Sequence, residues 1–252
     1  MMIKITEKCS MGCTHCMNDA SKLGKHMSFD VFKDVIAFQK KYGTSFVILT
    51  GGEPTEHPHF KEYLLYALNE LKYCFITVLT NGVWMQDNQD FIYEICNMYG
   101  NRITFQVTTV PEYYPVCIDT KLPVFQLSNI IVCTKIEAIY PQGRALHNKL
   151  PWKANASKCI NVRLITHQVG FRGLRGIFNI MAAYGFFCTP HITISGDIKL
   201  GESDLCPIAS SIYKEEHEII DDILSFNCAI CGFVNEKLPN QAKKVLGITD
   251  AI

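Results

Sequence analysis

Apolar residues along the first 110 positions alternate between short continuous runs and longer segments with helical spacing. Residues 28–42 carry an apolar face at helical spacing, with Ser28 as a candidate N-cap and Gly43 after the last turn. The runs Ser45–Thr50 and Phe75–Thr80 are the kind of apolar segment expected of strands within a buried sheet.

The same alternation continues on both sides of these elements. Met2 to Thr6 predicts a first strand and Arg102 to Val110 a fourth, and two further helices are expected at about 58–71 and 87–98. Four strands alternating with three helices indicate parallel βα units, and therefore an α/β fold of the partial (β/α)6 barrel type. In such barrels the chemistry lies at the carboxyl ends of the strands.

The alternation breaks after Val110. Residues 111–128 contain three prolines and no clear amphipathic helix, and a β-rich piece follows at Ile130–Tyr140. This pattern predicts an irregular second half of the barrel, in which the sequence does not place the fifth and sixth strands.

A second, smaller unit is expected after a linker at about Leu150–Ser157. Its pattern predicts a helix at Phe171–Tyr184, a β-hairpin at His191–Leu200 that turns at 195–197, and a helix at Glu215–Phe226. We therefore divide the chain into a barrel (residues 1–150), a small cysteine-rich α+β unit (residues 151–236) and a tail (residues 237–252).

Composition narrows the classes of function. Charged residues make up 19% of the chain and sum to zero net charge, so nothing in the charge favours nucleic acid or an anionic membrane as a partner. The chain has no apolar run of about 18 residues, so a membrane span is not expected. Twelve cysteines without an export signal favour a reducing cytoplasm, where thiols bind metal rather than form disulfides.

Three of these cysteines stand in one short loop directly after the first predicted strand. Cys9, Cys13 and Cys16 have the spacing C-x3-C-x2-C, and Gly12 relaxes the backbone between them. A shared ligand role suits three thiols better than a disulfide, which joins two at a demanding geometry. A four-thiolate zinc site would need another ligand nearby, and the next cysteine is Cys74. An iron–sulfur cluster accepts such spacing, and with three protein ligands it leaves one iron open.

The segment Gly51-Gly52-Glu53-Pro54 follows the second predicted strand. Together with the C-x3-C-x2-C loop, it resembles the radical S-adenosylmethionine (radical SAM) superfamily. The resemblance implies a 4Fe–4S cluster on the three loop cysteines, SAM on the fourth iron, and an electron donor of the flavodoxin or ferredoxin type. Reductive cleavage of SAM would give a 5′-deoxyadenosyl radical that abstracts hydrogen from a substrate. A zinc-binding or merely cysteine-rich fold is the alternative.

The resemblance also implies roles for single residues. Gly51 and Gly52 would let the backbone approach the methionine end of SAM, Glu53 would face its ammonium group, and Pro54 completes the segment. His15 takes the position where the family usually places an aromatic residue against adenine, although a lone histidine is more often solvated.

Three further residues stand at the ends of later elements. Asn81 and Thr108, at the ends of the third and fourth strands, would reach the ribose or the carboxylate of SAM, or simply cap the strands. Arg144 would pair with the SAM carboxylate or instead brace the end of the barrel. The sequence singles out no catalytic acid or base.

The C-terminal unit carries its own group of cysteines. Two flank the predicted hairpin and a C-x2-C pair follows the last helix; they are Cys188, Cys206, Cys228 and Cys231, with Cys159 as a substitute for one of them. The first part of this arrangement resembles the auxiliary-cluster motif of SPASM and twitch radical SAM enzymes, which implies one further 4Fe–4S cluster at most. A structural zinc on the same four thiolates is the alternative.

Three hypotheses of function follow. In the first, the chain is a radical SAM enzyme that modifies a peptide or protein, as in the maturation of ribosomally made peptides. In the second, it acts on a small metabolite in cofactor or antibiotic biosynthesis, or activates a glycyl-radical enzyme. In the third, it is a zinc-binding structural protein without catalysis. We favour the first, because SPASM and twitch enzymes commonly modify peptides or proteins.

Overall fold

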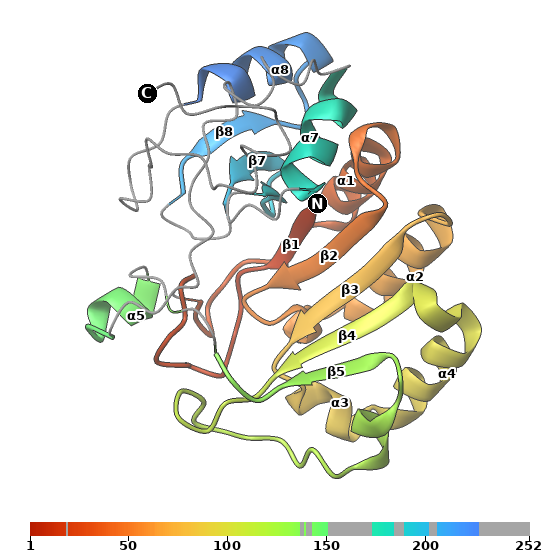
Figure 1. Ribbon diagram of the computed structural model, residues 1–252, viewed down its shortest axis with the longest axis vertical. Coiled ribbons are helices and arrows are strands. Elements are labelled where there is room, and N and C mark those ends of the chain that lie inside the picture. The colour runs from red at the N-terminus through yellow and green to blue at the C-terminus, as the bar shows by residue number, and fades with distance from the viewer. Residues whose placement is uncertain are drawn as a thin grey trace, which may run out of the picture.

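An eight-stranded sheet runs through the described part of the chain in this computed structural model (Figure 1). The structure describes residues 1–18, 20–136, 139, 143–150, 173–183, 189–201 and 206–226. The strands are β1 (Met2–Thr6), β2 (Phe46–Gly51), β3 (Phe75–Thr80), β4 (Ile103–Thr108), β5 (Ile130–Cys133), β6 (Pro190–Ile192), β7 (Asp197–Leu200) and β8 (Ile208–Ser211). Their order across the sheet is β5-β4-β3-β2-β1-β6-β7-β8.

The strands from β5 across to β6 all run parallel, whereas β7 and β8 are antiparallel to their neighbours. The parallel α/β arrangement predicted from the sequence is therefore confirmed. The predicted hairpin near residues 191–200 is also confirmed as β6 and β7, but β8 had no clear signal in the sequence.

Among the described strands, β6 lies at the opposite end of the parallel run from β5. β6 does not follow β5 across the sheet but pairs with the other edge of β1, where Met2 lies opposite His191. A free edge of β1 would leave backbone N–H and C=O groups unpaired, and β6 pairs with these groups. The strands after residue 189 thus extend the sheet of the first 150 residues. The division of the chain into domains at residue 150 stays a prediction.

The described helices are α1 (Phe29–Tyr42), α2 (Phe60–Glu70), α3 (Val83–Asp87), α4 (Gln89–Tyr99), α5 (Gly143–His147), α7 (Gly173–Ala183) and α8 (Glu216–Ser225). Five of them, α1, α2, α4, α7 and α8, agree with the predicted helices to within a few residues, whereas the short α3 and α5 were not predicted. Ser28 caps α1 as predicted, because its hydroxyl accepts a hydrogen bond from the N–H of Val31. None of the helices described here is long and apolar enough to cross a membrane.

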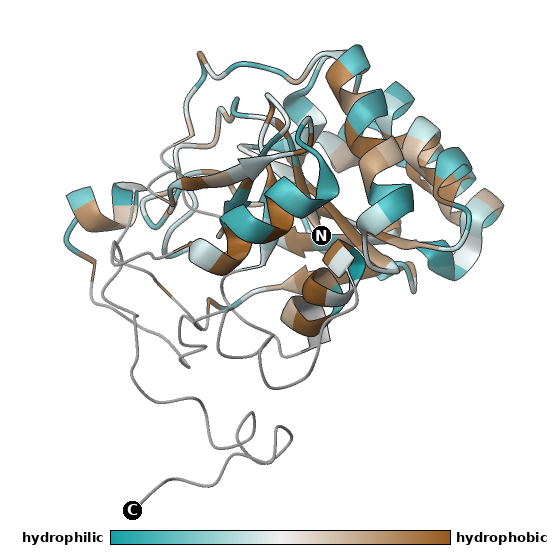
Figure 2. Ribbon diagram, turned by 90° about the horizontal axis from the view of Figure 1, so that it is seen from above, coloured by the Kyte–Doolittle hydropathy of each residue, from teal (hydrophilic) through white to brown (hydrophobic). Residues whose placement is uncertain are grey.

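One side of the sheet is buried beneath helices. Alternate side chains of β2 to β4, such as Val47, Ile76 and Phe105, are almost completely buried and form one cluster with Phe32 of α1 and Tyr63 of α2. The rings of Phe32 and Tyr63 stack with their centroids 4.5 Å apart. Figure 2 shows the corresponding division of the helices into hydrophilic and hydrophobic sides. Burial of these apolar faces is the main stabilising contribution to this half of the fold.

The other side of β2–β5, which we call the open face, is partly exposed among the described residues. Phe46, Phe75 and Ile131 are the most exposed of its apolar residues, at 61%, 46% and 53%. By strand alternation the open face comprises Phe46, Ile48, Thr50, Phe75, Thr77, Leu79, Thr104, Gln106, Thr108, Ile131 and Cys133.

Two histidines outside the predicted site are buried. His57 is 3% exposed, and its Nε2 hydrogen-bonds to the carbonyl of Met27 at 3.0 Å. His191 is 2% exposed because it lies in β6, against β1. Burial lowers the pKa of His191 to about 3, so its ring is neutral at neutral pH.

We predict that Phe32→Ala lowers the free energy of unfolding by about 3–5 kcal/mol, because it removes a fully buried ring and leaves a cavity against Tyr63. Urea unfolding followed by circular dichroism measures the change. Tyr73→Ala is the control, since Tyr73 is 94% exposed, and should change the free energy by less than about 0.5 kcal/mol. Equal losses in both variants would contradict the assignment of the core.

Candidate active site

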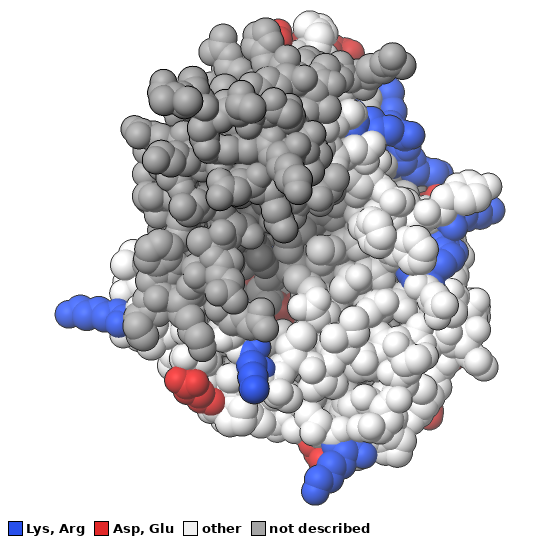
Figure 3. Space-filling model, viewed as in Figure 1, with Lys and Arg blue, Asp and Glu red and all other residues white. Residues whose placement is uncertain are grey.

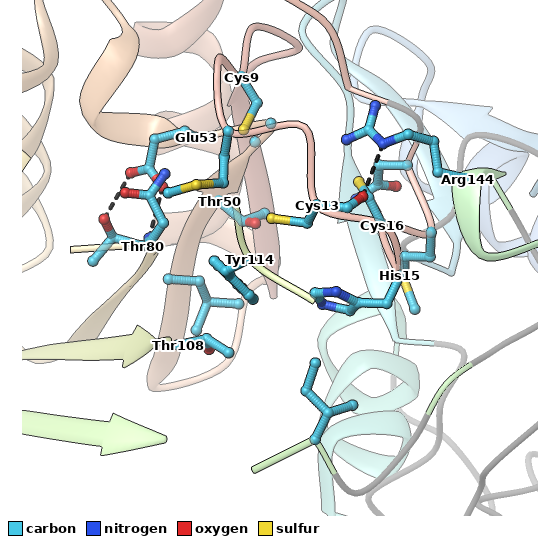
Figure 4. Close-up of a pocket in the computed structure, with 18 residues that line it drawn as sticks. Cys9, Cys13, His15, Cys16, Thr50, Glu53, Thr80, Thr108, Tyr114 and Arg144 are labelled. Atoms are coloured by element: carbon cyan, nitrogen blue, oxygen red, sulfur yellow. Dashed lines mark hydrogen bonds between the residues drawn. The ribbon is translucent and has the colours of Figure 1, made fainter. Parts of the chain in front are cut away.

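A cavity of about 290 Å³ lies at the carboxyl ends of β1 to β4 (Figure 4). It is lined by the loop after β1, the ends of β2, β3 and β4, and three later residues. The lining residues are Cys9, Met11, Cys13, His15, Cys16, Met17, Asn18, Thr50, Gly51, Gly52, Glu53, Leu79, Thr80, Asn81, Thr108, Tyr114, Ile136 and Arg144. The structure thus brings both sequence motifs to one cavity, at the end of the sheet where the barrel prediction expects chemistry.

The three predicted cluster ligands line this cavity from one irregular loop. Cys13 is buried, and Cys9 and Cys16 are half-buried. Burial raises the pKa of Cys9 to about 11, and burial together with the two neighbouring thiols raises that of Cys13 to about 12. Both thiols are therefore protonated at neutral pH in the metal-free chain, so metal binding must displace their protons.

The thiols surround the cavity without converging on one point. Among the described residues, no three His, Cys, Asp or Glu side chains are placed to hold one metal ion together. In an iron–sulfur cluster each cysteine binds a different iron atom, so its thiols stand farther apart than the ligands of a single ion. Among the described residues, the buried atoms His15 Nδ1 and Asn18 Oδ1 of the cavity lining have no hydrogen-bond partner. This donor set fits a 4Fe–4S cluster with a polar cosubstrate.

Gly51 and Gly52 allow the end of β2 to pack directly on the start of the cysteine loop. The N–H of Gly52 donates to the carbonyl of Thr6 at 2.8 Å. A Cβ on Gly51 would lie 2.5 Å from that carbonyl oxygen, and a Cβ on Gly52 would lie 2.4 Å from the carbonyl oxygen of Lys8. Any side chain at either position would push the two segments apart, so both glycines are required by a backbone-on-backbone contact.

The same segment binds the loop through hydrogen bonds beyond the glycines. The N–H of Glu53 donates to the carbonyl of Lys8 at 2.7 Å. Glu56 then accepts from both the N–H and the hydroxyl of Ser10, at 2.7 and 2.8 Å. The Gly-Gly-Glu-Pro segment therefore fixes where the cysteine loop begins.

Glu53 is 3% exposed and joins the ends of β2 and β3. Its Oε1 accepts from the hydroxyls of Thr55 and Thr80, each at 2.7 Å, and from the N–H of Thr55. Its Oε2 accepts from the N–H of Asn81 at 2.7 Å. Burial raises the pKa of this carboxyl, and the hydrogen bonds oppose the shift. Glu53 thus has a structural role in addition to the predicted one, and Oε2 has acceptor capacity left for a ligand's ammonium group.

His15 lies in an aromatic group at the cavity rather than in solvent. Its ring centroid is 5.2 Å from that of Tyr113 and 5.3 Å from that of Tyr114. Burial, followed by the charge of Arg144, lowers the pKa of His15 to about 4, so the ring is neutral at neutral pH. A neutral ring with an unpartnered Nδ1 suits a contact with a heterocycle such as adenine.

The remaining predicted SAM residues divide into three groups. Asn81 and Thr108 line the cavity, and the side chain of Asn81 also accepts from the N–H of Val83, so their contact with SAM stays a prediction. Arg144 lines it as well, but its nitrogens bond to backbone carbonyls of the cysteine loop. Pro54 does not line the cavity, because it is buried at the first position of a 3₁₀ turn, Pro54–Glu56.

Sequence reasoning missed several lining residues, of which Tyr114 and Asn18 are the most informative. Tyr114 follows β4 in the irregular stretch, and burial raises its pKa. An aromatic pair, Tyr113 and Tyr114, just past the carboxyl end of a strand was the available signal. No signal in the sequence indicated Asn18, because only the fold of the cysteine loop places this residue at the cavity.

Of the predicted auxiliary-cluster ligands, Cys206 alone lies within the described part of the chain. It is 8% exposed and lies against Gly201, at which a Cβ would be 2.6 Å from the Cys206 sulfur. Cys159, Cys188, Cys228 and Cys231 lie outside the described residues, as does the tail at 237–252. The second metal site therefore stays a prediction.

Comparison with known sequences agrees with the site. Residues 3–123 match the family model of the radical SAM superfamily. The chain is 29% identical over 92 residues to the probable GTP 3′,8-cyclase of Methanosarcina acetivorans, and 29% identical over 89 residues to the GTP 3′,8-cyclase of Photorhabdus laumondii. Each match covers 34% of this chain and only 27% of the relative.

Solved structures are similar over more of the chain. SuiB of Streptococcus suis superposes with a TM-score of 0.55 at 16% identity, covering 92% of this chain and 70% of its own. BtrN in complex with AdoMet and 2-DOIA superposes with a TM-score of 0.54 at 14% identity, covering 90% of this chain and 81% of its own. The structure of anSMEcpe with bound AdoMet and a peptide superposes with a TM-score of 0.53 at 11% identity, covering 90% of this chain and 80% of its own. At these identities the likeness concerns the fold.

The family match includes the cysteine loop, the Gly51–Glu53 segment and β1 to β4, which together line most of the cavity. Residues 3–123 therefore match the radical SAM superfamily in sequence and contain both motifs identified above. Two of these three solved structures contain AdoMet, which is SAM.

We predict that Glu53→Gln destabilises the metal-free chain by about 1–3 kcal/mol, because an amide cannot accept all the hydrogen bonds that now reach the carboxylate. Its affinity for SAM in the reconstituted protein should fall about ten-fold or more. Urea unfolding and equilibrium dialysis measure the two effects. Glu62→Gln is the control, since Glu62 is exposed and contacts only His59 among the ion pairs found here. Parent-like stability and SAM affinity would contradict both roles.

Proposed function

We propose that this enzyme cleaves SAM reductively and abstracts a hydrogen atom from a peptide or protein substrate. The first part is supported by one observation: the three cysteines of the C-x3-C-x2-C loop and residues 51–53 line a single cavity at the carboxyl ends of parallel strands. When bound, the cluster and SAM together supply a 5′-deoxyadenosyl radical, which is the species that removes the hydrogen atom. The electron comes from a donor of the flavodoxin or ferredoxin type.

Different residues of the chain bind the cluster, the methionine end of SAM and the adenine. Cys9, Cys13 and Cys16 would hold the cluster through their thiolates. The segment at Gly51–Glu53 receives the methionine end, because it combines an accessible backbone with a buried carboxylate. His15 and Tyr114 form an aromatic wall for the adenine.

The open face supports a peptide rather than a nucleoside triphosphate as the substrate. Its residues on β2–β5 include no charged side chain, and Figure 3 shows a broad uncharged area in the described surface over these strands. A triphosphate needs several cationic groups around it, whereas a peptide backbone needs neutral donors and acceptors such as Thr104 and Gln106. Both residues are half-buried on β4, next to Thr108 at the cavity.

The similar proteins support two kinds of substrate. The peptide bound to anSMEcpe supports the first. The 2-DOIA bound to BtrN and the name GTP 3′,8-cyclase support a small metabolite, which is therefore our second candidate. Incubation with SAM and either a peptide library or a metabolite extract distinguishes them, because only a true substrate raises the yield of 5′-deoxyadenosine.

We predict that Cys13→Ala abolishes SAM cleavage to 5′-deoxyadenosine and methionine after anaerobic reconstitution and reduction, because one cluster ligand is lost. Cys96→Ala is the matched control. Cys96 is also buried, at 6% exposure, but lies in α4 away from the cavity. The control should retain cleavage and iron, and unchanged cleavage in Cys13→Ala would falsify the first cluster assignment.

We also propose that the predicted twitch-like region holds one auxiliary 4Fe–4S cluster on Cys188, Cys206, Cys228 and Cys231. Replacing Cys228 and Cys231 together with Ala should lower bound iron from about eight to about four per chain, at four irons per cluster. Iron and sulfide analysis of the reconstituted protein measures this. Zinc at the site in anaerobically purified protein would identify it as structural and contradict the proposal.

A further inference from the structure

The carbonyl groups of the cysteine loop receive hydrogen bonds from a segment far along the chain. Arg144 lies 131 positions after Cys13, and its Nε donates to the Cys13 carbonyl at 2.9 Å. Its Nη1 donates to the carbonyl of Ala20 at 2.6 Å. One guanidinium group therefore bonds to two points of the loop, one on each side of the last cysteine ligand, and Figure 4 shows the bond to Cys13.

Two neighbouring residues extend this contact. Asn148 Nδ2 donates to the carbonyl of Thr14 at 2.8 Å, and the N–H of Ala145 donates to the carbonyl of Cys16 at 3.4 Å. Together with Arg144, residues 143–148 satisfy four carbonyls of a loop that has almost no regular secondary structure.

The backbones themselves are in close contact at the start of this segment. Gly143 has a φ of +51°, and a Cβ there would lie 2.6 Å from the carbonyl of Met17. Only glycine tolerates both the positive φ and this approach. The contact therefore depends on backbone geometry as well as on the arginine side chain.

We infer that residues 143–148, which we call the loop clamp, hold the cysteine loop in the shape that binds the cluster, and that Arg144 is the main positioning residue. The identity of the bound cluster rests on the proposed function. The clamp itself is a property of the metal-free chain. Arg144 also places its positive charge beside Cys13, where it favours the thiolate and partly offsets the effect of burial.

This role differs from a direct contact between Arg144 and the carboxylate of SAM, which the sequence left open. A bidentate arginine–carboxylate pair uses two parallel N–H groups. In this structure Nε and Nη1 are engaged by loop carbonyls instead. These two hydrogen bonds support a bracing role for Arg144, and the measurements below distinguish that role from recognition of the cosubstrate.

Hydrogen exchange in the metal-free chain tests the clamp without any cluster or SAM. The N–H groups of Thr14 and Cys16 bond to the carbonyls of Tyr113 and Cys13, so they report on the shape of the loop. Arg144→Met should speed the exchange of peptides covering residues 10–20 by about ten-fold or more. Asn148→Ala, which removes one exposed hydrogen bond, should speed it by a smaller factor.

Arg175→Met is the matched control. Arg175 also bridges two carbonyls, those of Lys40 and Lys41 at 2.7 and 2.8 Å, but at the end of α1. The Arg175→Met variant should therefore exchange its amide hydrogens in residues 10–20 at the parent rate. The Arg144→Lys variant keeps the charge but cannot donate to both carbonyls from one planar group, so its residues 10–20 should exchange faster than those of the parent.

Iron binding and SAM binding complete the test. After reconstitution, Arg144→Met should bind iron at the loop less completely than the parent and Arg175→Met. Parent-like exchange and iron content, with weakened SAM binding alone, would show that Arg144 is a SAM ligand and overturn the inference. Full rescue by Arg144→Lys would overturn it too, because charge alone would then suffice. If the parent binds no iron, the proposed function fails, and the exchange result still decides whether the clamp exists.

Discussion

The cysteine loop carries backbone polar groups that it cannot pair within itself, and the arrangement of the site depends on how they are satisfied. Unpaired buried amides and carbonyls cost free energy, so a loop without regular secondary structure needs partners from elsewhere. Three segments provide them: the Gly-Gly-Glu-Pro segment at its start, Tyr113 at its middle and the loop clamp at its end. They come from after β2, β4 and β5, so the shape of the loop depends on the parallel sheet that positions these segments.

The two faces of the sheet differ in packing: helices cover one face, and the open face is partly exposed. One face buries β-branched and aromatic residues such as Ile76 and Phe105 beneath the helices, which fixes the spacing of the strands and therefore of their carboxyl ends. The open face carries uncharged residues such as Thr104 and Gln106 between the exposed rings of Phe46 and Phe75 and the cavity. A rigid support on one side and a neutral surface on the other is the arrangement that positions a substrate beside a reactive cofactor.

Several ionisable groups of the cavity have pKa values shifted toward their neutral forms in the metal-free chain. Burial raises the pKa of Cys9, Cys13 and Glu53 and lowers that of His15. The cavity therefore favours neutral groups until a metal or a charged cosubstrate changes the balance. The positive charge of Arg144 opposes this shift at Cys13, the thiol with the most strongly raised pKa. Hydrogen bonds to loop carbonyls hold Arg144 in this position.

The sequence by itself determined the βα alternation, the two motifs and the end of the sheet where they meet. These are local or periodic signals, and residues such as Ser28, Gly52 and Cys13 have the expected places in the structure. Only the tertiary structure decided that β6 pairs with the free edge of β1 and that Tyr114 and Asn18 line the cavity. It also showed what the loop clamp contacts. Strand order and loop-to-loop hydrogen bonds join residues more than 100 positions apart, and no short-range pattern records which distant backbone group a carbonyl will meet.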